Sequence, residues 1–241
     1  MTLTELLIPT YRQMLQALGV WLRKAEAQVE DADALMAARL APDMFPLSTQ
    51  VRFACVQAYE GVHRLRHESM PPALEALLDE GRNGGDHPGT MAEALARVDE
   101  ALAFLGTLAP DALDAGAGRP LELGLPMGLT FDLDGEGYAR DWALSQFYFH
   151  LMTAYAILRN QRVELGKADY VQHMFAFMRH RQWTPTKPHP RVPCAGRGGY
   201  AARPPAPPRL TLGSRARTFD CRRAAGSFDA LLRLPNENGI S

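Results

Sequence analysis

The chain has 241 residues, of which 46% are hydrophobic and 22% are charged, and its formal net charge at pH 7 is −1. This length allows one or two globular domains with a sizeable core. The three cysteines, Cys55, Cys194 and Cys221, share no metal-ligand spacing, which argues against a disulfide scaffold or a zinc knuckle and favours a reducing cytosol.

The N-terminus has no basic stretch followed by an apolar run, which argues against a secretion signal. The uncharged residues 142–158 fall just short of the roughly 18 residues expected of a membrane span. This run also contains the polar residues Ser145, Gln146, His150 and Thr153. We therefore expect a soluble, cytoplasmic protein with no membrane partner.

The first predicted element is a helix over about residues 9–30. Apolar residues recur there at spacings of three and four, and Pro9 suits a first helical turn because its missing N–H costs nothing at that place. Residues 31–40 predict a short extra helix. Pro42 and Pro46 are expected to end it.

The second long helix is predicted over residues 47–65, again from an apolar stripe at helical spacing. Cys55 lies on that stripe among aliphatic neighbours, so we expect a small core residue rather than a reactive thiol. Residues 68–88 are rich in proline and glycine and predict a loop. Within this loop, residues 73–78 are expected to hold a helical turn.

A capping box at Thr90 and Glu93 predicts the start of the third long helix, which continues to about residue 105. Leucine and phenylalanine then alternate with other residues over 121–125 and 129–133. Alternation at period two around a Pro-Met-Gly turn predicts a small β-hairpin.

The last long helix, residues 142–158, is apolar on several sides. A helix of this kind must be covered by neighbours on those sides. Its polar line consists of Gln146, His150 and Thr153, and His150 and Gln146 are therefore expected not to face water directly. Four striped helices joined by short connections predict an all-α fold, an antiparallel four-helix bundle with the hairpin before the last helix.

The C-terminal part of the chain differs in composition. From Val171 onward the formal charge is +9, which leaves −10 for the residues before it, and eight prolines lie within residues 185–208. A segment with so little apolar surface cannot offset the entropy lost on ordering. We predict a helical domain over 1–172 and a disordered Pro/Arg-rich tail over 173–241.

Two segments resemble a known family. Residues 38–51 (ARLAPDMFPLSTQV) and 147–170 (FYFHLMTAYAILRNQRVELGKADY) are similar to an uncharacterised domain-of-unknown-function family of the DinB/YfiT-like superfamily. The resemblance covers roughly residues 1–170 and implies a DinB-type four-helix bundle that is often a homodimer. Many members of the superfamily hold a divalent metal with three histidines, one from the second helix and an HxxxH pair from the last, and some are thiol-dependent transferases.

The resemblance places only one of these three histidines in this chain. His150 falls on the second histidine of the pair, Gln146 falls on the first, and Gln50 falls near the ligand of the second helix. We therefore expect no metal cofactor, with a divalent metal bound at His150 as the alternative. Arg162 stands where the family usually has glycine.

His150 with Gln146, and with Gln50 from the second helix, is the main candidate site. A neutral imidazole beside a carboxamide inside a bundle suits the binding of a small polar ligand or weak base chemistry. The structural alternative is a buried histidine that is satisfied by a hydrogen bond to a neighbouring helix. Because metal centres in proteins need at least three protein ligands, the sequence predicts a metal here only as the less favoured reading.

A second histidine pair is His63 and His67, whose i, i+4 spacing puts both rings on one helical face. That face also carries Arg52 and Glu60, so we expect it to be exposed to solvent rather than to bind zinc. Asp132, Asp134 and Glu136 resemble a calcium loop but lack its terminal glutamate, and a turn with a helix start explains these residues better.

Other catalytic and binding motifs are missing from the sequence. It contains no GxSxG motif and no phosphate-binding loop after a strand. The arginines of the tail have little aromatic interleaving, so no specific nucleic-acid binding is expected. The sequence predicts a helical-bundle protein that binds a small ligand or dimerises, with a metal- or thiol-dependent transferase that uses His150 as the alternative.

Overall fold

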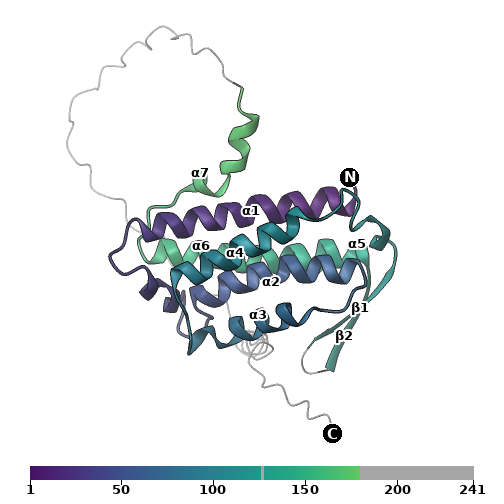
Figure 1. The fold of residues 1–241 in the computed structure, drawn as a ribbon, viewed down its shortest axis with the longest axis horizontal. Helices are drawn as coiled ribbons and strands as arrows, with labels where there is room; N and C mark the ends of the chain where they lie inside the picture. Colours follow the sequence, from purple (N-terminus) through teal and green to yellow (C-terminus); the bar gives the residue numbers. More distant parts are fainter. Residues whose placement is uncertain (126–127, 180–241) are drawn as a thin grey trace, which may run out of the picture.

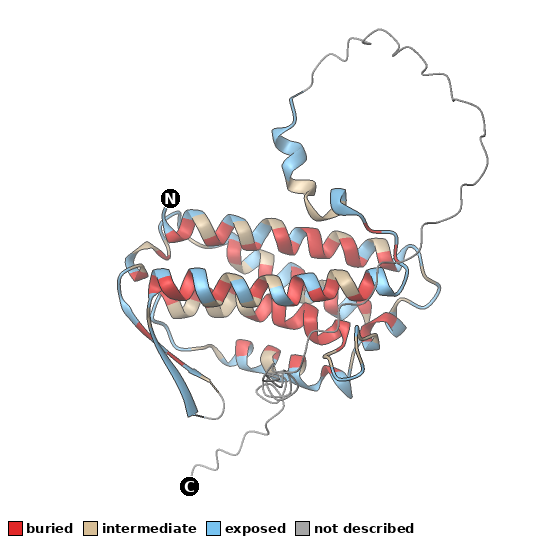
Figure 2. Ribbon diagram, turned by 180° about the vertical axis from the view of Figure 1, so that it is seen from behind, coloured by how far each residue is buried: buried red, intermediate tan, exposed pale blue. Residues whose placement is uncertain are grey.

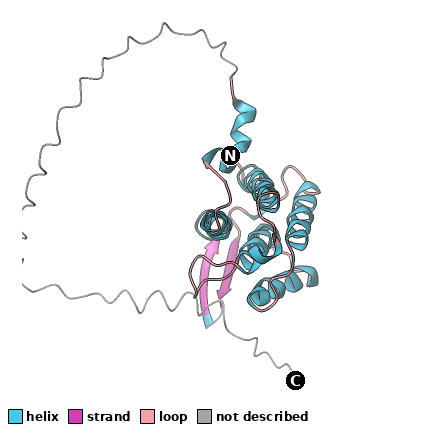
Figure 3. Cartoon of the chain, turned by 90° about the vertical axis from the view of Figure 1, so that its left-hand side faces the viewer, coloured by secondary structure: helices cyan, strands magenta, loops and turns pink. Residues whose placement is uncertain are grey.

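The computed structural model describes residues 1–125 and 128–179, which form a mostly helical fold with one small sheet (Figures 1 and 3). Figure 3 shows the long helices almost end-on, side by side. The long helices are α1 (Leu3–Glu26), α2 (Leu47–Leu65), α4 (Met91–Gly106) and α6 (Leu144–Asn160). A shorter helix, α3 (Pro72–Arg82), packs on α2.

Short elements connect the long helices. The sheet consists of β1 (Pro120–Leu125) and β2 (Leu129–Asp134). The 3-10 turns are η1 (Asp33–Ala37), η2 (Asn83–Gly85), η3 (Asp114–Gly116) and η6 (Gln172–Phe177). A helical turn α5 (Gly135–Gly137) and a π-helical turn η5 (Tyr138–Ala143) lead into α6, and α7 (Lys167–Tyr170) follows it.

The first helix begins six residues earlier than predicted. Thr2 and Glu5 form a capping box, in which the Thr2 hydroxyl accepts from the Glu5 amide and the Glu5 carboxylate accepts from the Thr2 amide. Pro9 therefore lies inside α1, and the predicted start at Pro9 is wrong. The missing N–H of Pro9 leaves the carbonyl of Glu5 without its helical partner, which is tolerable because Glu5 is exposed.

Two other helices and the hairpin confirm their predictions. Helix α2 covers residues 47–65 as expected, and the capping box of Thr90 and Glu93 starts α4. The hairpin pairs antiparallel, with Leu121 opposite Leu133. The predicted turn at residues 73–78 is longer than expected, because it is part of the three-turn helix α3.

The buried core runs along the facing sides of the long helices (Figure 2). Cys55 is fully buried, which confirms the prediction of a core residue. Helix α6 is covered less completely than expected. Phe147 and Leu151 are buried, but Phe149 is 53% exposed and Met152 is 40% exposed, so one face of α6 remains open.

The chain after α6 is attached to α1 through Asp169. The indole N–H of Trp21 donates to the carbonyl of Asp169 at 3.1 Å, and Lys24 forms an ion pair with the Asp169 carboxylate. The ring of Tyr170 stacks on Trp21. These contacts hold α7 against the end of α1, beyond which Met174 and Phe177 of η6 are exposed.

Several predictions about the tail concern residues that the structure does not cover. η6 lies in the first residues of the predicted tail, and the rest of the tail, with Cys194 and Cys221, lies outside the described residues. The domain boundary at residue 172 stays a prediction. Across residues 1–125 and 128–179, none of the helices has the length and apolar character needed to cross a membrane.

Candidate functional site

The structure brings together two of the three predicted site residues. Gln50 comes from the first turn of α2 and His150 from the middle of α6, 100 positions apart in sequence. The Nδ1 atom of His150 lies 2.9 Å from Oε1 of Gln50, within hydrogen-bond distance. Both side chains are buried, with exposed fractions of 3% for His150 and 2% for Gln50.

The hydrogen bonds of Gln50 assign the tautomer of His150. Nε2 of Gln50 donates to the carbonyl oxygen of Phe45 at 3.3 Å, and that carbonyl can only accept. The amide oxygen of Gln50 therefore faces the imidazole, so Nδ1 of His150 carries the proton and donates. In a neutral imidazole with this tautomer, Nε2 has a free lone pair.

Aromatic rings surround the imidazole. Phe53 meets it edge-on with ring centroids 5.2 Å apart, and Phe149 does so at 5.3 Å. Phe45 in turn packs edge-on against Phe53. Burial in this apolar shell penalises the charged form and lowers the pKa of His150 from 6.5 to about 3. The ring is therefore neutral at physiological pH.

Gln146 does not join the pair. It lies one turn before His150 on α6 and is half-buried, but it makes no hydrogen bond to Gln50 or His150 in the described residues. Thr153, the third member of the predicted polar line, is buried and donates to the carbonyl of Phe149 at 2.7 Å. Of the two residues expected to be sheltered from water, His150 is buried, whereas Gln146 is only half-buried.

The residues present do not fit a three-histidine metal centre. Gln50, Gln146 and His150 offer one imidazole nitrogen and two amide groups, whereas zinc centres take histidine, cysteine or carboxylate ligands. In the part of the chain that the structure describes, no three histidine, cysteine or acidic side chains gather into a group that could hold a metal ion.

The prediction of a solvent-exposed face with His63, His67 and Arg52 is wrong in two respects. Helix α2 ends at Leu65, and His67 has a φ of 54°, so the two histidines do not share a helical face. Arg52 is only 1% exposed. His63 is half-buried, and its Nδ1 lies 3.1 Å from a carboxylate oxygen of Glu68.

Arg52 is buried because α3 covers it. Its Nε donates to Glu80 of α3 at 2.8 Å, and its Nη1 donates to the carbonyl oxygens of Ser48 and Pro88, both at 3.3 Å. A buried guanidinium needs such partners. The sequence reading missed this arrangement because it treated the residues of α3 as part of a loop.

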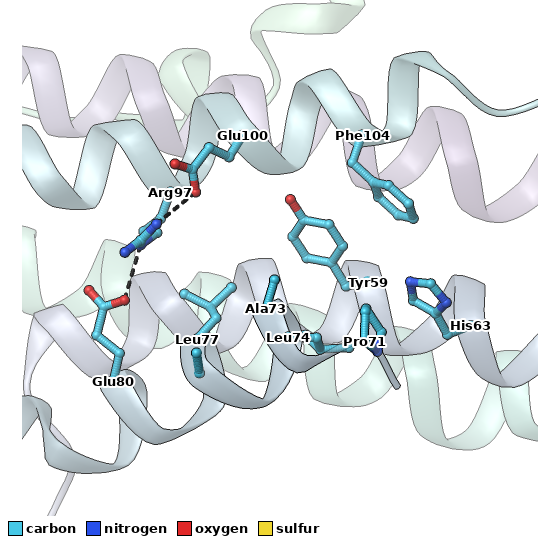
Figure 4. Close-up of a pocket in the computed structure, with 11 residues that line it drawn as sticks. Tyr59, His63, Pro71, Ala73, Leu74, Leu77, Glu80, Arg97, Glu100 and Phe104 are labelled. Carbon is cyan, nitrogen blue, oxygen red and sulfur yellow. Dashed lines mark hydrogen bonds and ion pairs between the residues drawn. The ribbon is translucent and has the colours of Figure 1, made fainter. Parts of the chain in front are cut away.

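The structure also contains a pocket that the sequence analysis did not foresee. A cavity of about 430 Å³ lies between α2, α3 and α4 (Figure 4). Its lining residues are Tyr59, His63, Pro71, Ala73, Leu74, Ala76, Leu77, Glu80, Arg97, Glu100 and Phe104. None of the three predicted site residues is among them. The sequence pointed to this pocket only through Tyr59 and Phe104, which are aromatic residues that lie outside the predicted apolar stripes of their helices.

Two smaller predictions can also be compared with the structure. The pKa of the Cys55 thiol is raised to about 12, chiefly by burial, so this thiol does not ionise near neutral pH. The Asp134 carboxylate accepts from the amide of Gly137 at 2.7 Å and caps α5, which confirms the turn and helix start predicted there.

Comparisons with known proteins agree with this fold. Residues 3–171 match the family described as "Domain of unknown function (DUF1993)". The chain is also similar to a DinB family member protein from Shewanella denitrificans, with 32% sequence identity and a TM-score of 0.58 over 70% of this chain and 91% of that one. No curated protein matches the chain. With a family match over most of its length and a DinB-like fold, the chain belongs to the DUF1993 family of domains of unknown function.

Proposed function

We propose that this protein is a DinB-type antiparallel four-helix bundle that binds a small polar ligand at the buried pair of His150 and Gln50. The observation that supports this is the 2.9 Å contact between His150 Nδ1 and Gln50 Oε1. Burial in the apolar shell keeps the ring neutral, and the contact engages Nδ1, so the Nε2 lone pair has no partner among the described residues. A ring nitrogen with a free lone pair, on a side chain that is only 3% exposed, selects ligands that donate a hydrogen bond, because it can only accept one.

The proposed ligand is therefore a neutral molecule with an N–H or O–H group. A cation would face the cost of burial beside aromatic rings without a charged partner at the pair. An anion would offer only acceptors to the lone pair of Nε2.

The test uses nitrogen-detected NMR of the histidine rings in the full chain. Acetamide can donate to Nε2, whereas N,N-dimethylacetamide has the same carbonyl but no N–H. We expect acetamide to shift the His150 Nε2 resonance in a saturable manner and dimethylacetamide not to shift it. Equal responses to both probes, or a resonance that neither moves, would show that the pair has a structural role only.

An enzyme that uses His150 is the second candidate. The observation that favours it is again the free lone pair of Nε2, because a neutral imidazole whose Nδ1–H donates to an acceptor such as Gln50 Oε1 can accept a proton or bind a metal at Nε2. Metal analysis of the purified protein separates the candidates. Stoichiometric zinc, nickel or manganese that is lost on His150→Ala would favour a metal-dependent transferase, and its absence in both proteins would favour the ligand-binding proposal.

A homodimer is the remaining part of the proposal. Phe149 and Met152 form an exposed apolar pair on α6, three residues apart and so on one helical face. Exposed large apolar side chains that gather on one face are a feature of protein interaction sites. A partner copy that packs on this face would cover the open side of α6.

A further inference from the structure

The pocket between α2, α3 and α4 is separate from the His150 pair. Tyr59 follows Gln50 by nine residues on α2, and at about 100° per residue this places the two on opposite sides of the helix. The pocket volume of about 430 Å³ falls within the range of small-molecule sites, which is roughly 300–1,000 Å³. Figure 4 shows the lining side chains of α2, α3 and α4 pointing toward the same space.

One part of the pocket is aromatic and aliphatic. The rings of Tyr59 and Phe104 stack with centroids 4.6 Å apart, and His63 stacks on Phe104 at 5.6 Å. Helix α3 forms the facing wall with Leu74 and Leu77. This part of the pocket suits the apolar body of a ligand.

The other part of the pocket is a chain of ion pairs with alternating charge. Arg52, buried behind the pocket, binds one oxygen of Glu80 at 2.8 Å. The other oxygen of Glu80 accepts from Arg97 Nε at 3.0 Å, and Arg97 Nη1 donates to Glu100 Oε2 at 2.9 Å. The chain therefore runs from a buried cation to a terminal carboxylate on the pocket wall.

Glu100 has an oxygen left for a ligand. Its Oε1 atom has no partner among the described residues, and its side chain is 56% exposed. Figure 4 shows the Tyr59 hydroxyl pointing toward the same side as Glu100. Burial, together with Cys55 and Glu100, raises the pKa of Tyr59 to about 12, so this hydroxyl stays neutral and can accept a hydrogen bond.

These contacts decide the charge of the ligand. Arg97 is the guanidinium that lines the pocket, and it is already shared by the carboxylates of Glu80 and Glu100. An anion would have to displace one of them. A cation instead continues the alternation at Glu100 without breaking a pair.

We propose that this pocket binds a small organic cation, with a primary ammonium between Glu100 Oε1 and the Tyr59 hydroxyl. Its apolar body packs on Phe104, Leu74 and Leu77. The ammonium supplies three donors, which suits a carboxylate oxygen and a phenol oxygen at the same end of the site.

The test compares three probes of matched shape in titrations of the full chain. They are 2-phenylethylammonium, the neutral 2-phenylethanol and the anionic 3-phenylpropanoate, and binding is followed at the methyl resonances of Leu74 and Leu77. We expect 2-phenylethylammonium to bind more tightly than either of the others. Because the ion pair with Glu100 is partly exposed, Glu100→Gln should weaken its affinity by about threefold to fivefold.

A second variant fills the pocket without touching the charges. Ala73 lines the pocket on the exposed side of α3, so Ala73→Phe should abolish binding while the protein stays folded. The matched controls are the exposed Ala92→Phe on α4 and Glu122→Gln on β1, which should leave the affinity for 2-phenylethylammonium unchanged.

Three results would overturn the proposal. Equal affinity for the neutral alcohol would show that the carboxylate takes no part, and so would unchanged cation affinity in Glu100→Gln. Binding that survives Ala73→Phe would place the probe elsewhere. None of the three results bears on the His150 pair, whose ligand binding is measured at the ring resonance of His150.

Discussion

His150 Nδ1 lies 2.9 Å from Gln50 Oε1, and this single hydrogen bond joins the middle of α6 to the first turn of α2. The bond is buried on both sides. A buried hydrogen bond contributes modestly when formed, but breaking it leaves a polar group without water or partner.

The first prediction concerns this bond. Gln50→Leu leaves the Nδ1–H of His150 unpaired and should lower the free energy of unfolding by about 1–3 kcal/mol. The double variant Gln50→Leu/His150→Phe removes both polar groups, so it should cost less than the sum of the two single variants. Urea unfolding measures all three. The exposed Gln16→Leu is the control, and strict additivity would contradict the prediction.

The second prediction is a pH dependence of stability. The pKa of His150 is about 3 in the folded protein and about 6.5 when unfolded, so between these values the unfolded chain binds a proton that the folded chain does not. Stability should therefore fall as the pH falls, by about 2 kcal/mol between about pH 6.5 and pH 5. Urea unfolding at the two pH values measures it. In His150→Phe the free energy of unfolding should no longer show this decrease. An equal pH dependence in the variant and the wild-type protein would show that the ring is accessible to protons.

The third prediction concerns the buried guanidinium. Glu80→Ala removes the carboxylate partner of Arg52, which is 1% exposed, and should destabilise the fold by about 3–5 kcal/mol. The double variant Arg52→Met/Glu80→Leu should recover most of this loss. Asp99→Ala is the matched control, because the ion pair of Asp99 with Arg23 is exposed and is worth less than about 1 kcal/mol. Thermal unfolding measures the stability of the variants. Similar losses of stability in Glu80→Ala and Asp99→Ala would contradict the prediction.

The fourth prediction uses the backbone after α6. Arg162 has a φ of 66°, in the left-handed region that glycine occupies without a steric penalty. Arg162→Gly should therefore stabilise the protein by up to about 1 kcal/mol. Arg12→Gly on the exposed side of α1 should instead destabilise it by about 1 kcal/mol. If the free energy of unfolding changes in the same direction in both variants, the positive φ of Arg162 does not destabilise the protein measurably.

The fifth prediction tests the proposed dimer. If the exposed Phe149 and Met152 meet a second copy, the wild-type protein should have twice the monomer mass of 26.6 kDa in light scattering. Phe149→Ser/Met152→Ser should reduce the mass to that of a monomer because it removes the apolar contact. Leu129→Ser, which changes an exposed leucine on β2, should not. A wild-type monomer would remove the dimer from the proposal.

The resemblance at Arg162 shows how sequence and structure explain each other. The resemblance implies a glycine at this position, and in the structure the chain turns there with a positive φ, which glycine adopts without strain. The same holds for the hairpin and for the capping box of Thr90 and Glu93, whose patterns lie within a few neighbouring residues. Local signals of this kind report backbone geometry directly.

Local rules also failed where two of them competed. Pro9 suits a helix start, but the capping box at Thr2 and Glu5 sets an earlier one, and the proline is carried inside the helix. Prolines and glycines suggested a loop over residues 68–88, yet Leu74 and Leu77 bury one side of a helix against α2. Packing of an apolar face overrode the local preference.

By itself the sequence determined the periodicity of the long helices, the hairpin and the chemical types at the candidate site, because these depend on residues that are near one another in the chain. The family resemblance placed Gln50, Gln146 and His150 at one site, but only the tertiary structure decided that Gln50 pairs with His150 and that Gln146 does not. The burial of Arg52 behind Glu80 and the pocket around Glu100 likewise arise where helices distant in sequence pack together. Contacts of this kind depend on how helix faces interlock, which no single stretch of sequence specifies.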